Sequence, residues 1–301
     1  MHIEILKPGL FTSLQQKEVT GFRSMGIGPG GVMDEFAASA ANHLLRNNEQ
    51  SFLLEMHFPA PELLFHTGTL IALTGGDFQA IGNGEPLNNW QTHFIPANSA
   101  IRFSGLKKGY RAYLSVYGGF KVENKAILRF GKTVPLKKGD GLFLNKPCNL
   151  LPGTYEAAML PERYEQVYAG NSTIYCLPGP EWETLSAEAK RQLQSASFTI
   201  STQSNRMGYR LEGTPVQHQF ASMLSSAADA GTVQLLPNGL PVILMSAHQT
   251  TGGYPRILSV LSPSRAVLAQ LPPGASISFS IISLQEAAER LISWRQLLAH
   301  L

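Results

Sequence analysis

The sequence predicts a mainly β protein in which antiparallel sheets close into barrels, accompanied by a few short helices. Most of the 301 residues fall into short apolar or alternating segments separated by turn residues, which is the pattern of strands. The 28 glycines and 19 prolines supply the tight turns that such an architecture needs. Because helical periodicity is confined to three places, the pattern favours barrels over a parallel α/β fold.

The three helices are expected at Met33–Arg46, Ser186–Gln194 and Ser283–Leu301. Asp34 lies near the positive N-terminal end of the first, and Ser186 can cap the second. The third carries apolar residues at helical spacing, so it is expected to pack as a terminal helix. The strand pattern is found, for example, at Leu63–Phe65, Leu70–Leu73, Ala100–Phe103, Tyr110–Val116, Thr232–Leu235, Val242–Met245 and Ser276–Ile282.

A weak internal repeat indicates two related halves. Residues 94–104 read FIPANSAIRFS and residues 270–280 read QLPPGASISFS, so that a turn precedes a small/apolar alternation in both. Turn chemistry alone can also produce this likeness. Residues 145–170, rich in Pro, Gly and Tyr, have the composition of a linker. The sequence therefore predicts two domains, residues 1–170 and residues 171–301.

Composition argues against several classes of partner and site. The 24 basic and 21 acidic residues give a net charge of +3 and form no Lys/Arg-rich run, so nucleic acid is a poor partner. No apolar run approaches the roughly 20 residues that span a bilayer, and no signal sequence is recognisable, so a cytoplasmic protein is expected. Cys148 and Cys176 make no CxxC pair, and neither a disulfide framework nor a metal site is expected.

The most unusual polar segment, AHQTTGGYPR at residues 247–256, follows the apolar strand Pro241–Met245 directly. It combines amide and hydroxyl groups with two glycines that permit a tight bend or close approach of a ligand to the backbone. A tyrosine adds a stacking face, and Arg256 a charge suited to carboxylate or phosphate. A hairpin turn capped by threonines is the alternative. The candidate binding residues are Gln249, Thr250, Thr251, Gly252, Gly253 and Tyr254.

A second polar segment contributes Ser204, Asn205 and Arg206. The guanidinium of Arg206 suits either an anionic substrate or a structural ion pair with a carboxylate such as Glu212. His248 is the best general-base candidate by its polar neighbourhood, so His248 and Arg206 are the two catalytic candidates.

Two glycine-rich segments have a structural and a functional interpretation. The segment Gly26–Asp34 enters the first predicted helix, where a phosphate cradle is conceivable, but it matches neither the Walker pattern nor GxGxxG, so a bend is favoured. In the segment Leu73–Asp77, Asp77 can orient a ligand or bond nearby backbone in a turn. HExxH and GxSxG are absent, so zinc hydrolysis and the usual serine-esterase elbow are unsupported.

Six motifs together resemble one family: that of the C subunit of 5-oxoprolinase, also known as the KipI-antagonist or allophanate hydrolase subunit 2 family, related to the carboxyltransferase region of urea carboxylase. The motifs occur in family order over roughly residues 5–280. They are GIGPGGVMD at Gly26–Asp34, ALTGGD at Ala72–Asp77, RAYLSVYGGF at Arg111–Phe120, LPGPEW at Leu177–Trp182, SNRMGYRLEG at Ser204–Gly213 and QTTGGYPRI at Gln249–Ile257.

The resemblance implies two cyclophilin-like β-barrel domains and a stable complex with a homologous B (KipI-like) subunit, acting together with an A subunit. The complex would open 5-oxo-L-proline to L-glutamate with hydrolysis of ATP, and this chain would be a hydrolase subunit that is inactive alone. ATP is the cofactor of the complex, not necessarily bound by this chain. Phosphorylation of the lactam oxygen would supply a better electrophile.

The sequence departs from the family at three places. Gln15 is followed by Gln16–Val19 instead of an Asp-x-Gly-Arg segment. Ala247 replaces an aspartate two residues before Gln249, and the stretch after Phe120 lacks a Leu-Gly-Ser-Arg pattern. These losses indicate a divergent member with altered substrate or weakened activity.

Two other functions remain open. One is a carboxyltransferase-like module that accepts biotin, whose ureido ring shares a planar amide with a lactam; the biotin carrier would then come from a partner. The other is a regulatory protein that sequesters a KipI-like partner without catalysis.

Overall fold

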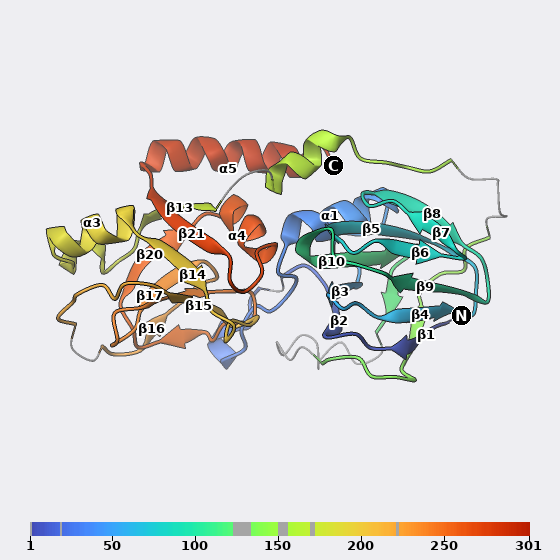
Figure 1. The fold of residues 1–301 in the computed structure, drawn as a ribbon, viewed down its shortest axis with the longest axis horizontal. Coiled ribbons are helices and arrows are strands. Elements are labelled where there is room, and N and C mark those ends of the chain that lie inside the picture. Colours follow the sequence, from blue (N-terminus) through green and yellow to red (C-terminus); the bar gives the residue numbers. More distant parts are fainter. Residues whose placement is uncertain (1, 19, 123–133, 150–155, 169–171, 221–222) are drawn as a thin grey trace. The chain divides into compact units, whose positions relative to one another are not determined.

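The computed structural model describes all residues except 1, 19, 123–133, 150–155, 169–171 and 221–222 (Figure 1). The chain divides into two compact units: unit 1 contains Met1–Glu18, Asp34–Gln166 and Leu301, and unit 2 contains Val19–Met33 and Val167–His300. The boundary predicted near residue 170 and part of the predicted linker lie outside the described residues, as do Val19 and most of the stretch that follows Phe120.

The glycine-rich segment before the first helix belongs to unit 2 although it comes early in the chain. Two contacts hold it there: Arg23 forms an ion pair with Asp229, and the Arg206 guanidinium donates to the backbone carbonyl of Gly31. The sequence alone did not indicate that this early segment belongs to unit 2, because both contacts join residues far apart in the chain.

Unit 1 consists of two antiparallel sheets with a shared apolar core. The seven-stranded sheet has the order β11-β12-β1-β4-β9-β6-β7, and the five-stranded sheet the order β2-β3-β10-β5-β8. Ile5 and Phe65 from the first sheet and Leu54 and Leu114 from the second are fully buried in this core. The strands are β1 His2–Lys7, β2 Thr12–Gln15, β3 Leu53–His57, β4 Glu62–Phe65, β5 Thr69–Asp77, β6 Ala80–Gly82, β7 Glu85–Leu87, β8 Gln91–Ile95, β9 Ser99–Phe103, β10 Lys108–Val116, β11 Phe120–Lys121 and β12 Gly141–Leu144.

Helix α1 (Glu35–Leu44) packs on β5 and β10 of the five-stranded sheet. Asp34 caps it, since its Oδ1 accepts from Ala37 N at 3.1 Å. The backbone N–H of Asp34 in turn donates to Tyr113 Oη at 2.9 Å, and that phenol donates to Glu55 Oε2 at 2.9 Å. Burial raises the pKa of Tyr113 well above its ordinary value, so the phenol remains a donor. The helix start is thus fixed by a buried polar network on β3 and β10.

Unit 2 is a closed barrel with the strand order β13-β20-β17-β18-β15-β14-β21 (Figure 1). All neighbours in it are antiparallel except β13 and β21, which run parallel. An odd number of strands cannot alternate in direction all the way round a ring, so one parallel pair is required. The strands are β13 Thr173–Pro178, β14 Ser197–Ile200, β15 Gly208–Glu212, β16 Ser226–Ala227, β17 Thr232–Leu235, β18 Pro241–Leu244, β19 Thr251–Gly252, β20 Arg256–Val260 and β21 Ser276–Ile281, of which β16 and β19 form a separate two-stranded sheet.

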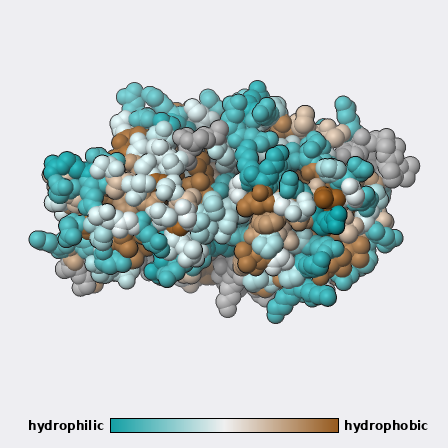
Figure 2. Space-filling model, in the orientation of Figure 1, coloured by the Kyte–Doolittle hydropathy of each residue, from teal (hydrophilic) through white to brown (hydrophobic). Residues whose placement is uncertain are grey.

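Three α-helices among the described residues accompany the barrel. They are α3 Ala187–Ser195, α4 Ser262–Ala269 and α5 Leu284–Ala299, and the short 3₁₀ turns of the chain are η1 Arg23–Met25, η2 Glu162–Tyr168 and η3 Trp182–Thr184. Helix α3 packs on β21, and α4 and α5 on β13. None of the helices in the described part of the chain is long and apolar enough to cross a membrane. On the face drawn in Figure 2, hydrophobic residues form small groups among hydrophilic ones.

The mainly β prediction is confirmed, and so are the three predicted helices, including the Ser186 cap, whose Oγ accepts from Ala189 N at 3.1 Å. Two details differ. Helix α4 was not predicted, because its short sequence SPSRAVLA is bounded by prolines that read as turns. The Leu73–Asp77 segment belongs to β5 and is not a turn; Gly75 there takes φ +74° and the pairing with β10 shifts register. The expected bond of Asp77 to nearby backbone is confirmed, since its Oδ1 accepts from Gln79 N at 3.0 Å.

The two repeated segments also agree only in part. Each contains a turn followed by a strand, β9 in the first and β21 in the second. Strand β8 precedes the first turn, whereas helix α4 precedes the second. The likeness is therefore local to the turn and its following strand.

Removal of the Tyr113 hydroxyl is expected to destabilise unit 1. Tyr113→Phe leaves the buried Glu55 carboxylate and the Asp34 N–H each without one partner, at a cost of about 1–3 kcal/mol. Urea unfolding of the native chain and the variant measures this. Tyr117→Phe is the control, because Tyr117 is 36% exposed; equal stability losses for the two variants would contradict the role of the network.

Candidate functional site

Strand pairing brings the two polar segments that the sequence singled out to the same edge of the barrel. The segment that contains Ser204–Arg206 precedes β15, and the segment that contains Gln249–Tyr254 follows β18. These strands pair antiparallel with Gly208 opposite Leu244. Two backbone bonds continue the ladder beyond the strands: Met245 N donates to Met207 O at 3.1 Å, and Ala247 N donates to Arg206 O at 2.9 Å. The start of one strand and the end of the other therefore carry both loops together.

A cavity of about 190 Å³ lies beside these loops. Along β15 and β18, Tyr209 and Ile243 point into the barrel core, so the alternating residues between them face outward. The cavity is thus on the outer face of the barrel. Its lining residues are Asn205, Met207, Gly208, Arg210, Gln234, Leu236, Val242, Leu244, Gln249 and Tyr254.

The polar segment before β15 is ordered by its own hydrogen bonds. Ser204 Oγ accepts from Arg210 N at 3.0 Å and donates to Arg210 O at 3.3 Å. Asn205 Oδ1 accepts from Met207 N at 2.8 Å, which is the turn expected of an asparagine in such a loop. Asn205 lines the cavity, whereas Ser204 is engaged with the backbone of Arg210.

In the polar segment after β18, some residues line the cavity and others belong to the two-stranded sheet of β16 and β19. Gln249 lines the cavity and is exposed, and Tyr254 lines it with 42% of its surface exposed. Thr251 and Gly252 form β19, which pairs with β16, and Thr250 O accepts from Ala228 N at 3.1 Å. The predicted binding residues of this loop are therefore not equivalent, because the threonines take part in main-chain pairing.

Gly252 lies directly against the side chain of Gln234 on β17. A Cβ at this position would overlap the carboxamide of Gln234. The glycine was expected to allow a ligand close to the backbone; what approaches it is the Gln234 side chain. At Gly253 the nearest described atom to a Cβ would be Met223 O at 3.4 Å, an ordinary contact.

The two catalytic candidates, Arg206 and His248, are buried at 7% and 2% exposure and are not among the cavity residues. Arg206 donates to the carbonyl of Gly31. The His248 ring donates from Nδ1 to Gln249 O at 2.7 Å, and its own carbonyl lies 2.6 Å from where a Cβ of Gly28 would be. Both residues thus contact neighbouring backbone, and the bend interpretation of the glycine-rich segment fits this packing.

Arg256, which the sequence offered as an anion-binding charge, pairs with Glu181 of the LPGPEW motif. Its backbone N, Nε and Nη2 donate to the Glu181 carboxylate at 2.7, 3.1 and 2.8 Å, and Nη1 donates to Ala227 O at 3.0 Å. The Arg256 guanidinium holds the pKa of the Glu181 carboxyl below its ordinary value. This pair joins β20 to the turn that follows β13.

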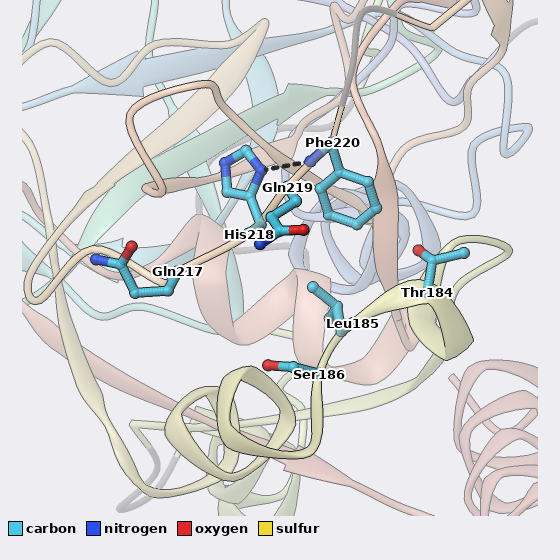
Figure 3. A pocket seen from close by; sticks show the side chains of 7 residues that line it. All are labelled: Thr184, Leu185, Ser186, Gln217, His218, Gln219 and Phe220. Atoms are coloured by element: carbon cyan, nitrogen blue, oxygen red, sulfur yellow. Dashed lines mark hydrogen bonds between the residues drawn. The ribbon is translucent and has the colours of Figure 1, made fainter.

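A second cavity of unit 2, of about 440 Å³, contains none of the predicted site residues. Figure 3 shows His218 beside Phe220, with Leu185 and Ser186 on a separate segment. Both ring nitrogens of His218 contact backbone: Nδ1 accepts from Phe220 N at 3.2 Å and Nε2 donates to Leu236 O at 3.1 Å. The smaller cavity is the better candidate because the polar motifs surround it.

Gln234 and Arg210 are cavity residues that the sequence reasoning did not select. Gln234 interrupts the apolar strand TVQL, and strict alternation puts it on the face opposite Val233 and Leu235. A polar residue within an apolar strand was the available signal. Among the described residues, no group of three or more His, Cys, Asp or Glu is arranged to hold a metal ion, and Cys148 and Cys176 are free thiols.

The Glu181–Arg256 pair is expected to make the free energy of unfolding depend on pH in the acidic range. Because the folded pKa of Glu181 is lowered, the stabilisation is present above its unfolded pKa of about 4.3 and is lost as the pH falls through the folded pKa. Glu181→Gln should therefore cost about 1–3 kcal/mol at pH 7 and less at pH 3. Unfolding at both values tests this, with exposed Glu183→Gln as control; a cost independent of pH would count against it.

An added methyl group at Gly252 is expected to displace the Gln234 carboxamide. Gly252→Ala should shift the Gln234 side-chain NH₂ resonances, whereas Gly253→Ala should shift them less, since only the first Cβ overlaps the amide. Amide-detected NMR spectra of the two variants compare the same chemical change at adjacent positions. Equal shifts would refute the close approach.

Comparison with known proteins places this barrel and its motifs in one family. The family model for the carboxyltransferase domain, subdomain A and B, matches residues 25–281. The chain is 32% identical to the 5-oxoprolinase C subunit of Escherichia coli (strain K12) and 30% identical to that of Haemophilus influenzae, in each case over 95% of this chain and 93% of the relative.

Larger proteins contain a similar module. The Saccharomyces cerevisiae urea amidolyase is 26% identical over 95% of this chain but only 17% of its own length. The crystal structure of Kluyveromyces lactis urea carboxylase superposes with a TM-score of 0.88 and 26% identity, covering 99% of this chain and 29% of that one. The chain belongs to the family of the carboxyltransferase domain, subdomain A and B, together with the bacterial 5-oxoprolinase C subunits.

Proposed function

We propose that this chain is the C subunit of an ATP-dependent 5-oxoprolinase, which acts with a homologous B (KipI-like) subunit and an A subunit in the cytoplasm. The observation that carries the proposal is the likeness to two bacterial 5-oxoprolinase C subunits across 93% of their length. The urea amidolyases, by comparison, share 26% identity over 17% of theirs.

The chemistry of the outer-face cavity supports a small planar amide as its ligand. Asn205, Gln234 and Gln249 bring carboxamides to it, and Leu236, Val242 and Leu244 bring apolar surface. Arg210 and Tyr254 add further polar groups, so the lining presents hydrogen-bonding and apolar surface in similar measure. A volume of about 190 Å³ is below the several hundred Å³ of sites for drug-sized ligands, so a single small ring is the expected occupant.

The role of the chain in the reaction is binding and orientation. Opening a lactam requires activation of a resonance-stabilised amide, which ATP supplies in the complex by phosphorylating the lactam oxygen. Carboxamides neither gain nor lose protons near neutral pH, so cavity residues of this kind can hold the ring and exclude water while partner subunits supply the reacting groups. On this proposal the chain alone does not turn over substrate.

A second function, a biotin-dependent carboxyltransferase module, is favoured by one observation. The urea carboxylase structure matches 99% of this chain with a TM-score of 0.88. The ureido ring of biotin is a planar cyclic amide like 5-oxoproline, and the same three carboxamides would hydrogen-bond to it. Biotin on a carrier domain of a partner would then bring the carboxyl group.

Reconstitution tests the proposal. The purified chain, combined with its B and A subunits, should release phosphate and glutamate in a 5-oxoproline-dependent reaction, and omission of any subunit should stop it. Gln249→Ala should raise KM for 5-oxoproline about tenfold, since a hydrogen bond to substrate is lost. Gln194→Ala is the control, because Gln194 is an exposed glutamine on α3.

Failure of the complete complex to hydrolyse ATP with 5-oxoproline would overturn the proposal. Saturable binding of a biotinylated carrier with no 5-oxoproline turnover would favour the carboxyltransferase module in its place.

A further inference from the structure

Gln234 is a buried polar residue at the candidate cavity for which the fold has no evident use. It lies on β17, opposite Val242 of β18 and Arg256 of β20. Its side chain is 3% exposed, although it faces away from the barrel core and lines the cavity. The β19 loop covers it, with Gly252 directly against the carboxamide.

The Gln234 Nε2 atom has no hydrogen-bond partner among the residues that the structure describes. The neighbouring Arg256 cannot satisfy this nitrogen, because a guanidinium only donates hydrogen bonds. Burying an amide without a partner is costly. A partner supplied by a bound ligand accounts for a glutamine in this place.

The surrounding packing keeps the carboxamide at the cavity. Gly252 leaves room for the amide in its present position, which an added Cβ would overlap. The apolar neighbours Leu236, Val242 and Leu244 offer it no hydrogen bond from their side chains. Tyr254 adds an aromatic ring at the same cavity, which can pack against a planar ligand. The Gln234 carboxamide thus lies at a cavity that combines apolar side chains and an aromatic ring with the polar side chains of Asn205, Arg210 and Gln249.

We propose that Gln234 recognises the N–H and C=O edge of a cyclic amide through its side-chain carboxamide. A lactam or cyclic ureide holds its amide cis, so its N–H and C=O point to the same side. A glutamine carboxamide presents its own acceptor and donor side by side, which matches that edge with two parallel hydrogen bonds. An open-chain secondary amide is trans and cannot present both groups to one side.

This inference rests on the proposed function for the identity of the natural ligand, a 5-oxoproline-like lactam, and assigns Gln234 as the residue that selects the cyclic amide. A site built to hydrogen-bond a group rejects an analogue that lacks it. The site should therefore discriminate 2-pyrrolidinone from γ-butyrolactone, in which a ring oxygen replaces the N–H.

The test is an NMR titration of the full chain, and of its complex with the B subunit, with these two probes. The native protein should bind 2-pyrrolidinone at least about tenfold more tightly than γ-butyrolactone. In Gln234→Met, which keeps the length of the side chain and removes the amide, the preference should fall to less than about twofold. Gly252→Ala should reduce it as well, since the added Cβ overlaps the Gln234 amide.

Gln270→Met is the matched control. Gln270 lies in the same unit with 7% exposure and is outside the cavity, so the same substitution should leave the preference unchanged. Thermal unfolding of both variants shows whether Gln234→Met folds; if it does not, the Gly252→Ala titration decides.

Three outcomes would each overturn the inference. They are equal binding of the two probes by the native protein, no binding of 2-pyrrolidinone by the chain or the complex, and an unchanged preference in Gln234→Met. Turnover of 5-oxoproline by a complex that contains Gln234→Met at the native KM would do so while leaving the proposed function intact. If the complex prefers the lactam in a way that depends on Gln234 but does not turn over 5-oxoproline, the proposed function is contradicted and the inference about Gln234 stands.

Discussion

The hydrogen-bonding register of four neighbouring barrel strands, β15, β18, β17 and β20, is the constraint on which the candidate site depends. Gly208 opposite Leu244 carries the two polar loops to one edge, and Gln234 opposite Val242 puts the buried glutamine on the outer face beside them. A shift of β17 by one residue against its neighbours would turn Gln234 toward the core. Closure of the barrel prevents such a shift, because every strand is held on both sides.

Most of the motifs in unit 2 stabilise one another. Glu181 from LPGPEW holds Arg256 from QTTGGYPRI, and Arg206 from SNRMGYRLEG holds the carbonyl of Gly31 from GIGPGGVMD. Charge-assisted bonds of this kind, partly buried at Glu181–Arg256 and buried at Arg206, hold these loops in place. The motifs therefore reflect the packing of loops around the barrel, and only some of their residues line the cavity.

The alanine at position 247 has a limited structural effect in this arrangement. Its backbone N–H donates to Arg206 O at 2.9 Å, a bond that does not depend on the side chain. The two loops thus remain joined without the aspartate that the family usually has there.

The sequence by itself determined the mainly β class, three helices and the two polar segments, because these follow from periodicity, turn residues and local polarity. It also identified Asn205, Gln249 and Tyr254, which line the cavity. Only the tertiary structure decided that Arg206 bonds to Gly31, that Arg256 pairs with Glu181, and that Gln234 lines the cavity against Gly252. The physical reason is that each of these assignments depends on a partner distant in the chain, which barrel closure selects and local sequence does not encode.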